Sequence, residues 1–329
     1  MAGTLNPVPA SEDVTSTRIS PEQDMESLVA FHEGLLTWYA KSRRDLPWRG
    51  TPDPYRVLVA EFMLQQTQVS RVAPVFDRFI ALFPTMAMLA NAPVADVIRA
   101  WTGMGYNRRA VNLHRAATMI VSQHGGIIPS DPELLLALPG IGRYTATAVA
   151  CFGFGRPVAV VDTNVRRVLG RVAVGLAPIS PSRAWLLAEQ SLPLAVSATP
   201  DWNQALMDLG ASICAPRIPR CGECPVRTVC VSAPGVEAAD DARAVTMIAE
   251  RRPAQKYIGS SRYYRGRIVE ILRTASGPVP LPQLTNLIFA RANQRGDEGP
   301  AQEVQACRLV EGLQKDGLVR QDDDGVSLP

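Results

Sequence analysis

The sequence predicts an all-α protein with two domains. Two segments near the middle of the chain, DPELLLAL (131–138) and RYTATAVACF (143–152), have the character of short helices joined by a Gly-rich turn. A further helical segment, TNVRRVLGRV, directly follows Asp162. The strands that we expect are confined to a short pair at the C-terminus. A chain of 329 residues is long enough for about two domains of the usual size.

Composition excludes several classes of protein. With 47% hydrophobic and 20% charged residues the chain can bury a core and is ordinary for a soluble protein. No stretch approaches the roughly 18 apolar residues that a membrane span needs. Residues 1–21 are polar and lack an apolar segment, so we expect a disordered leader and not a signal peptide. These features favour a cytoplasmic protein that binds no membrane.

Basic residues are almost all arginines. The only lysines are Lys41, Lys256 and Lys315, so residues 42 to 255 contain none. Arginine suits bidentate contacts to phosphate, although a high Arg and Ala content can equally reflect genomic base composition. The net charge of +3 is too small to identify a partner.

The segment CAPRIPRCGECPVRTVC (214–230) brings four cysteines together with the spacing C-x6-C-x2-C-x5-C. A disulfide pair is disfavoured in a reducing compartment. Structural zinc usually uses two separated C-x2-C pairs, and this loop has one. Four thiolates from one short loop suit a [4Fe–4S] cluster, which we favour over zinc. The expected ligands are Cys214, Cys221, Cys224 and Cys230.

Two carboxylates stand in contrasting surroundings. Asp162 precedes a helical segment, where Asp is a favoured N-cap and its charged form is stabilised. Glu61 interrupts the apolar run YRVLVAEFMLQQTQV, which places it either on the solvent-facing stripe of a helix or half-buried. The apolar sequence by itself favours a position on the solvent-facing side of the helix. Half-burial would instead raise the pKa of Glu61 and make it a proton donor.

The turn PGIG between the two short helices is a candidate phosphate site. Gly140 and Gly142 leave backbone N–H groups uncovered at a helix N-terminus. With the VVDTNVRR segment about twenty residues later and the four-cysteine loop, this turn resembles the helix-hairpin-helix region of the endonuclease III and MutY DNA glycosylases. The resemblance spans about two-thirds of the chain and implies an all-α glycosylase core over residues 22–230. It also implies that residues 22–45 pack with the cluster half and that the active site lies between the halves.

Within this family, the segment LPWRGTPDPYRVLVAEFMLQQTQV resembles the MutY form closely. The resemblance implies that Glu61 protonates the adenine ring and that Asp162 is its electrostatic or nucleophilic partner. Endonuclease III-type enzymes carry a Schiff-base lysine where this chain has Tyr144, so we expect a monofunctional glycosylase. Tyr144 alone fits both adenine enzymes and the thymine/uracil mismatch branch. Gln204 in DWNQALMDLGASIC matches the residue that contacts the flipped adenine.

Further residues are assigned by the same resemblance, and each could instead be a packing residue. We expect Trp48, Arg49 and Asn164 to line the base pocket. A flipped base leaves a gap that side chains must fill, and the residues expected to fill it or to contact the duplex are Gln66, Thr67, Met104, Gly105 and Tyr106. The expected phosphate contacts are Gly140, Gly142, Arg143, Arg217, Arg220 and Arg227, of which the last three could also be solvated loop charges.

The C-terminal region does not resemble the Nudix-like domain that follows the core in standard MutY proteins. We expect a linker over residues 231–258 and a winged-helix-like domain over 259–329, with three helices and a two-strand wing turning at DDDG. Basic residues and tyrosines alternate over 251–273, which suits a DNA backbone. The sequence leaves open whether this domain contacts DNA, discriminates the opposing base or binds a protein.

These features predict a monomeric enzyme that removes adenine mispaired with 8-oxoguanine or guanine from double-stranded DNA. Two alternatives are a thymine or uracil glycosylase acting opposite guanine, and a non-catalytic DNA-binding sensor that uses the cluster. The presence of both Glu61 and Asp162 argues against the sensor.

Overall fold

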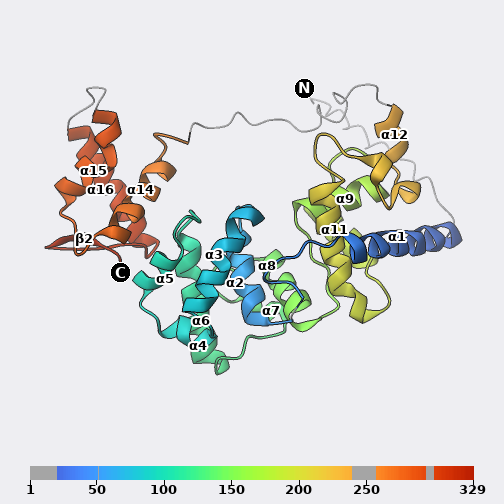
Figure 1. Cartoon of the computed structure of the whole chain (residues 1–329), viewed down its shortest axis with the longest axis horizontal. Coiled ribbons are helices and arrows are strands. Elements are labelled where there is room, and N and C mark those ends of the chain that lie inside the picture. The colour runs from blue at the N-terminus through green and yellow to red at the C-terminus, as the bar shows by residue number, and fades with distance from the viewer. Residues whose placement is uncertain (1–20, 51, 239–256, 294–299) are drawn as a thin grey trace, which may run out of the picture.

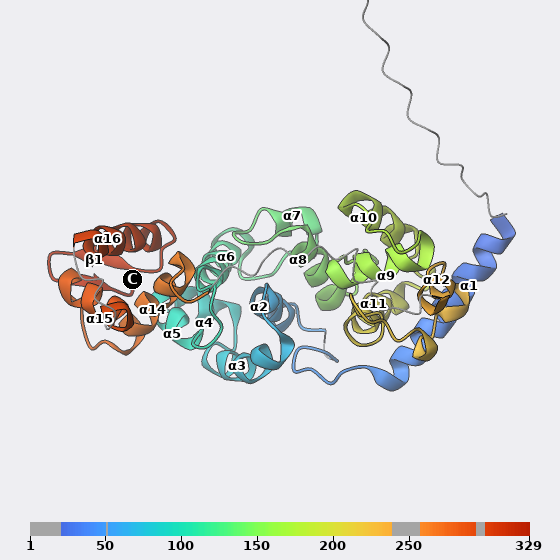
Figure 2. The ribbon, with the colours of Figure 1, turned by 90° about the horizontal axis from the view of Figure 1, so that it is seen from above.

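A computed structural model describes residues 21–50, 52–238, 257–293 and 300–329. Residues 1–20 of the expected leader and 239–256 of the expected linker lie outside the described residues. The second range includes Arg251, Arg252 and Lys256 of the basic segment noted above. Figure 1 shows the described part as three groups of helices in a row, and the view from above in Figure 2 keeps the same order. The middle group is the six-helix half of the core, flanked by the cluster half and by the C-terminal domain. This arrangement confirms the all-α prediction.

The middle group packs around α2, which is buried on nearly all sides. Side chains from α2, α3, α6 and the hairpin form one apolar cluster that includes Phe62, Phe76 and Trp101. The π-helical turn η1 (Val149–Gly153) continues α8 and packs on α2. The six helices of six residues or more in this group are α2 (Pro54–Leu64), α3 (Val69–Leu82), α4 (Met86–Asn91), α5 (Val94–Ala100), α6 (Arg108–His124) and α8 (Arg143–Ala148). The shorter α7 (Pro132–Leu136) precedes α8 in the hairpin.

The cluster half is assembled from both ends of the core sequence. Phe31 and Leu35 of α1 pack with Trp202 and Leu206 of α11 in a second apolar cluster, so the N-terminal helix joins this half as expected. Neither α1 nor any other described helix is long and apolar enough to cross a membrane. The helices here are α1 (Pro21–Ser42), α9 (Thr163–Ala173), α10 (Pro181–Gln190), α11 (Thr199–Ser212) and α12 (Ala233–Ala238), with short 3₁₀ turns η2 (Val196–Ala198), η3 (Cys221–Glu223) and η4 (Arg227–Val229).

The C-terminal domain contains three helices and a two-stranded antiparallel sheet: α14 (Ser261–Thr274), α15 (Leu281–Asn293), α16 (Pro300–Lys315), β1 (Arg320–Asp322) and β2 (Gly325–Ser327). Its apolar cluster continues into the core through Ala95, Ile98 and Val111 of α5 and α6. Arg273, whose side chain is 6% exposed, donates to the carbonyl of Ile98 at 3.0 Å and to Oδ1 of Asn107 at 2.9 Å. The domain is therefore docked on the core.

Local chemistry explains the hairpin between α7 and α8. Asp131 caps α7 by accepting from the N–H of Glu133 at 2.9 Å. Gly140 has φ +80°, and a Cβ there would lie 2.8 Å from Cβ of Asn112, so only glycine fits. Gly142 differs from the expectation. Its φ of −101° suits any residue and its Cβ direction is open, so its backbone does not require glycine.

Candidate active site

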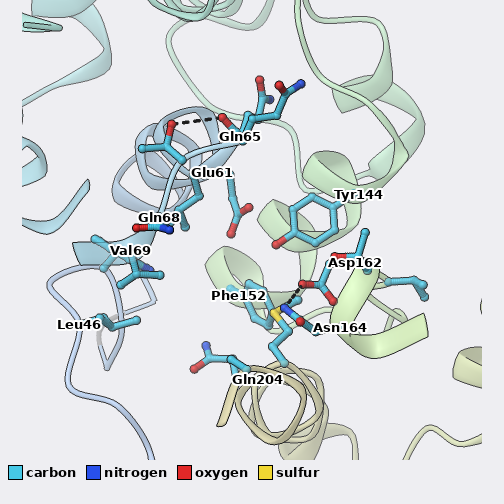
Figure 3. Close-up of a pocket in the computed structure, with 18 of the residues that line it drawn as sticks. Leu46, Glu61, Gln65, Gln68, Val69, Tyr144, Phe152, Asp162, Asn164 and Gln204 are labelled. Carbon is cyan, nitrogen blue, oxygen red and sulfur yellow. Dashed lines mark hydrogen bonds between the residues drawn. The ribbon is translucent and has the colours of Figure 1, made fainter. Parts of the chain in front are cut away.

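A pocket of about 980 Å³ lies between the six-helix half and the cluster half. Its walls come from α2 and the loop after it, from α8, from the N-terminus of α9 and from α11. Figure 3 shows Glu61, Tyr144, Asp162, Asn164 and Gln204 around this space, all of them predicted from the sequence. The pocket has the size of a small-molecule or nucleobase site.

Glu61 is buried in α2, with 5% of its surface exposed, and does not lie on a solvent-facing stripe. Its Oε2 has no hydrogen-bond partner among the described residues. The pKa of Glu61 is raised to about 7, chiefly by burial and also by the nearby charge of Asp162, whereas Tyr144 and Arg49 oppose the shift. The group is therefore poised to carry a proton near neutral pH.

Tyr144 lies on α8 opposite Glu61, and Figure 3 shows its hydroxyl pointing toward the Glu61 carboxyl group. Burial raises the pKa of Tyr144 well above its usual value, and the charges of Glu61 and Asp162 add to the effect. The phenol therefore remains neutral and can act as a hydrogen-bond donor to either carboxylate.

Asp162 lies at the N-terminus of α9, where hydrogen-bond donors surround it, in contrast to the apolar surroundings of Glu61. Its Oδ1 accepts from the N–H of Val165 at 2.7 Å, and its Oδ2 accepts from Nδ2 of Asn164 at 2.9 Å. Both contacts fix the orientation of the carboxyl group at the start of the helix. The N-cap role and a place in the pocket are combined in one residue, as the sequence suggested.

Hydrogen bonds run from Asp162 to the four-cysteine loop. Arg167 donates to Oδ1 of Asn164 at 2.9 Å and to the carbonyl of Cys214 at 2.9 Å. Arg171, one turn later on α9, donates to the carbonyl of Ala215 at 2.7 Å and lies 3.5 Å from Sγ of Cys214. The sequence analysis did not identify either arginine, because their partners lie more than 40 residues away.

Gln204 projects from α11 at the floor of the pocket (Figure 3). The hydroxyl of Tyr39 donates to its Oε1 at 2.7 Å. The amide group is thereby oriented so that Nε2 can donate to an acceptor in the pocket. Tyr39, on α1, is a positioning residue that sequence reasoning missed.

Arg49 and Trp48 also lie at the pocket, as predicted. The guanidinium of Arg49 donates to both oxygens of Asp208, at 2.8 and 3.0 Å, and Arg44 pairs with the same carboxylate. Asp208 is buried on α11, and although burial acts to raise its pKa, the two arginines hold it below the usual value. This ion pair ties the segment between the two halves to α11.

The loop 65–67 lines the pocket, and the loop 103–106 lies beside it on the neighbouring groove. Arg109 of α6 is buried and donates to the carbonyls of Met63 and Met104, at 2.7 and 3.2 Å, and to Oγ1 of Thr67 at 3.0 Å. It thereby joins the loop 65–67 to the loop 103–106. Gln66 and Tyr106, one in each loop, have the left-handed φ values of +56° and +43° that are rare outside glycine.

The prediction for Met104 is wrong in one respect. Its side chain is 1% exposed and belongs to the apolar core of the six-helix half, so it supports the loop from beneath. Gly105, Tyr106, Gln66 and Thr67 remain accessible. An apolar side chain at this position suits the cluster, to which Trp101 and Phe79 also belong.

The expected phosphate contacts are spread over two surfaces. Gly140 and Gly142 are exposed at the hairpin, while Arg143 donates to Glu189 at 3.0 Å and stacks 3.8 Å from the ring centroid of Trp185. On the cluster loop Arg217, Arg220 and Arg227 are exposed, and Arg220 pairs with Glu223 at 2.9 Å. The structure places these groups on the exterior and leaves their role in binding a prediction.

All four cysteines of the loop line one small cavity with Arg171. Among the described residues no three Cys, His, Asp or Glu side chains are arranged to hold a single metal ion. Two further cysteines lie outside the loop: Cys307 on α16, and Cys151, which is buried in the other half and receives a hydrogen bond from Asn203 at 3.4 Å.

Comparison with known proteins assigns the family. Residues 59–183 match the family described as "HhH-GPD superfamily base excision DNA repair protein". A protein of Mycolicibacterium smegmatis named adenine DNA glycosylase is 41% identical over 88% of this chain and 93% of its own length. The chain belongs to the adenine DNA glycosylase family. The human protein of the same name is 42% identical over 65% of this chain and 41% of its own length.

Solved structures agree with this family at the level of the core. A thermostable thymine-DNA glycosylase is 32% identical, with a TM-score of 0.60 over 64% of this chain and 99% of its own. Endonuclease III in a complex with DNA gives a TM-score of 0.55 at 21% identity, which supports the shared fold. The mycobacterial match is long enough that it must also extend into the C-terminal domain.

The burial of Glu61 predicts a cost in stability at high pH. The pKa of Glu61 is raised from 4.5 to about 7 in the folded state. The contribution of this group to the free energy of unfolding is therefore fully present below pH 4.5 and is lost as the pH rises through 7. Glu61→Gln removes this loss, which amounts to about 3 kcal/mol. We expect the urea midpoint of the variant to exceed that of the wild type at pH 8.5, with the difference shrinking toward pH 5.

The matched control is Glu33→Gln, which neutralises an exposed glutamate on α1. It should lose stability with rising pH as the wild type does. Parallel wild-type and Glu61→Gln curves across this range would show that Glu61 titrates normally.

Proposed function

We propose that this protein removes adenine from double-stranded DNA in which the adenine is mispaired with 8-oxoguanine or guanine. The observation that carries the proposal is the pair of carboxyl groups in one pocket, Glu61 buried and Asp162 held by donors. Membership of the adenine DNA glycosylase family supports the same reaction. A buried carboxyl group that can donate a proton, with a second carboxyl group in the same pocket, is the arrangement that cleaves glycosidic bonds in many hydrolases.

In the proposed reaction Glu61 is the general acid. Its proton passes to a ring nitrogen of the flipped adenine, so that the base can accept the electron pair of the breaking N-glycosidic bond and leave as neutral adenine. The sugar develops the positive charge of an oxocarbenium ion. Asp162 faces this charge as a carboxylate, while water adds to the sugar carbon and gives up a proton that restores Glu61.

Selection of adenine is assigned to Gln204, supported by Tyr39. With Oε1 engaged by the Tyr39 hydroxyl, Nε2 can donate to an acceptor nitrogen of the purine. Trp48 packs edge-to-face on Phe76, with centroids 5.4 Å apart, and gives the pocket an aromatic wall. Asn164 orients Asp162 by donating to its Oδ2.

Tyr144 stands where a lyase would need an amine. A neutral phenol cannot form a Schiff base, and the core from residue 42 to 255 contains no lysine to replace it. The proposed enzyme is therefore monofunctional and leaves the backbone intact after the base departs.

Single-turnover cleavage tests this proposal. Labelled duplexes carrying adenine opposite 8-oxoguanine, adenine opposite guanine, and thymine or uracil opposite guanine are incubated with the enzyme and read with and without alkali. We expect breaks in the adenine strand only, and only after alkali. The rate should fall as the pH rises above about 7, because Glu61 must be protonated.

Glu61→Gln and Asp162→Asn should each lower the rate by about a hundredfold or more, whereas Glu33→Gln should leave it unchanged. Cleavage of the thymine or uracil duplexes in place of adenine would assign the chain to the mismatch branch. Binding without cleavage of any duplex would favour the sensor.

We further propose that the cysteine loop holds one [4Fe–4S] cluster. The four thiols open onto one cavity in a partly apolar setting. Structural zinc is usually held by two separated C-x2-C pairs, and this loop has one. A cube gives one iron to each thiolate. Cys214, Cys221, Cys224 and Cys230 would hold it, and when bound it would supply structural support or redox chemistry away from the pocket.

Metal analysis of the purified protein tests this cofactor. We expect iron and acid-labile sulfide in equal amounts, about four of each per chain, with a broad absorbance near 400 nm. Cys224→Ser should lower both, while Cys151→Ser, at a buried cysteine outside the loop, should keep them. Zinc at one per chain, without sulfide, would contradict the assignment.

A further inference from the structure

A second groove, of about 810 Å³, lies between the six-helix half and the C-terminal domain. One wall is made by the loops 65–67 and 103–106, and the other by α14 and the end of α16. Figure 2 shows α14 as the element of the C-terminal domain nearest to α5 and α6. The sequence analysis left the role of this domain open.

The groove and the catalytic pocket are two sides of one wall. Gln65, Gln66 and Thr67 line both of them. If a base leaves the duplex and enters the catalytic pocket, the strand that stays behind must lie on the other side of this loop. The groove is on that side.

The charge of the groove suits a polyanion. Five arginines line it, against a single carboxylate, that of Asp316. Arg265 and Arg108 share Asp316, and the fixed position of Arg109 is described above. Arg71 and Arg262 are exposed, and among the described residues neither has a carboxylate partner. Two cations are thus available to phosphates.

Arg262 links the C-terminal domain to the wall loop. Its guanidinium carbon lies 3.8 Å from the ring centroid of Tyr106 and 5.6 Å from that of Tyr257, which is 55% exposed. Arginine stacked on aromatic rings still offers its N–H edge to phosphate. Tyr106 has a strained backbone, so a contact that fixes its ring also fixes the loop.

Contacts between the C-terminal domain and the core hold the two walls of the groove together. Arg273 binds the carbonyl of Ile98 and the side chain of Asn107, the residue after Tyr106, while apolar side chains of both parts share one cluster. The C-terminal domain therefore holds α14 at a fixed place beside the loops. A preformed cationic groove loses little conformational entropy on binding.

We propose that this groove binds the DNA strand opposite the one that gives its base to the catalytic pocket, and that Arg262 of α14 and Tyr257, which precedes that helix, contact that strand. This inference rests on the proposed glycosylase function. It assigns to the C-terminal domain a direct share of the duplex interface.

Photo-crosslinking identifies the strand. Tyr257 is replaced by p-benzoylphenylalanine in the full chain carrying Asp162→Asn, so that the adenine duplex stays intact. Each strand is labelled in turn. We expect crosslinks to the strand opposite the adenine. Crosslinks to the adenine strand alone, or none to DNA, would overturn the proposal.

Affinity measurements test the arginine on the same Asp162→Asn background. Arg262→Ala should weaken binding of the adenine duplex about tenfold and lower the salt dependence of binding by about one counterion. Arg320→Ala removes an exposed arginine of the same domain that does not line the groove, and should leave affinity unchanged. Equal affinities for Arg262→Ala and Arg320→Ala would overturn the proposal.

The two failures are distinguishable. If the unsubstituted chain cleaves no duplex, the proposed function fails. If it cleaves the adenine duplexes while Arg262→Ala binds them normally, only the assignment of the groove fails.

Discussion

The carboxyl group of Glu61, enclosed in an apolar helix without a partner for Oε2, is the constraint on which the site depends. A buried carboxyl without donors keeps its proton to a higher pH than one in water. Helix α2 can hold it there because the surrounding core, from α3, α6 and the hairpin, supplies the apolar enclosure. Burial of Glu61 lowers the folding stability at high pH. The same burial keeps a proton on the carboxyl group for the reaction.

Asp162 and Gln204 complete the site from the other half of the core. Each is fixed by a neighbour: Asp162 by Asn164 and the N-terminus of α9, and Gln204 by Tyr39 of α1. The ion pair of Asp208 with Arg49 connects the segment between the halves to α11. The two walls are therefore held at a defined separation by contacts outside the reacting groups. A base that enters this space meets a proton donor on one side and a carboxylate on the other.

Local rules were enough to predict the parts of the fold whose causes are local. The caps at Asp131 and Asp162 and the turn at Gly140 could be predicted from adjacent residues alone. The burial of Glu61 could not, because an apolar run does not say which face of its helix meets the core. Arg109 and Asp208 escaped notice because each has partners far away along the chain, Thr67 at 42 residues from Arg109 and Arg49 at 159 residues from Asp208. The family resemblance, not periodicity, placed Gln204 in the pocket.

The most direct test of the central claim is the titration of Glu61 itself. Carbon-13 NMR of the protein labelled at the glutamate side-chain carboxyls, with the Glu61 signal assigned by its loss in Glu61→Gln, reports the protonation state between pH 4 and 9. The account predicts a midpoint near 7. A midpoint near the ordinary value of about 4.5 would contradict it, because Glu61 would then hold no proton to give at neutral pH.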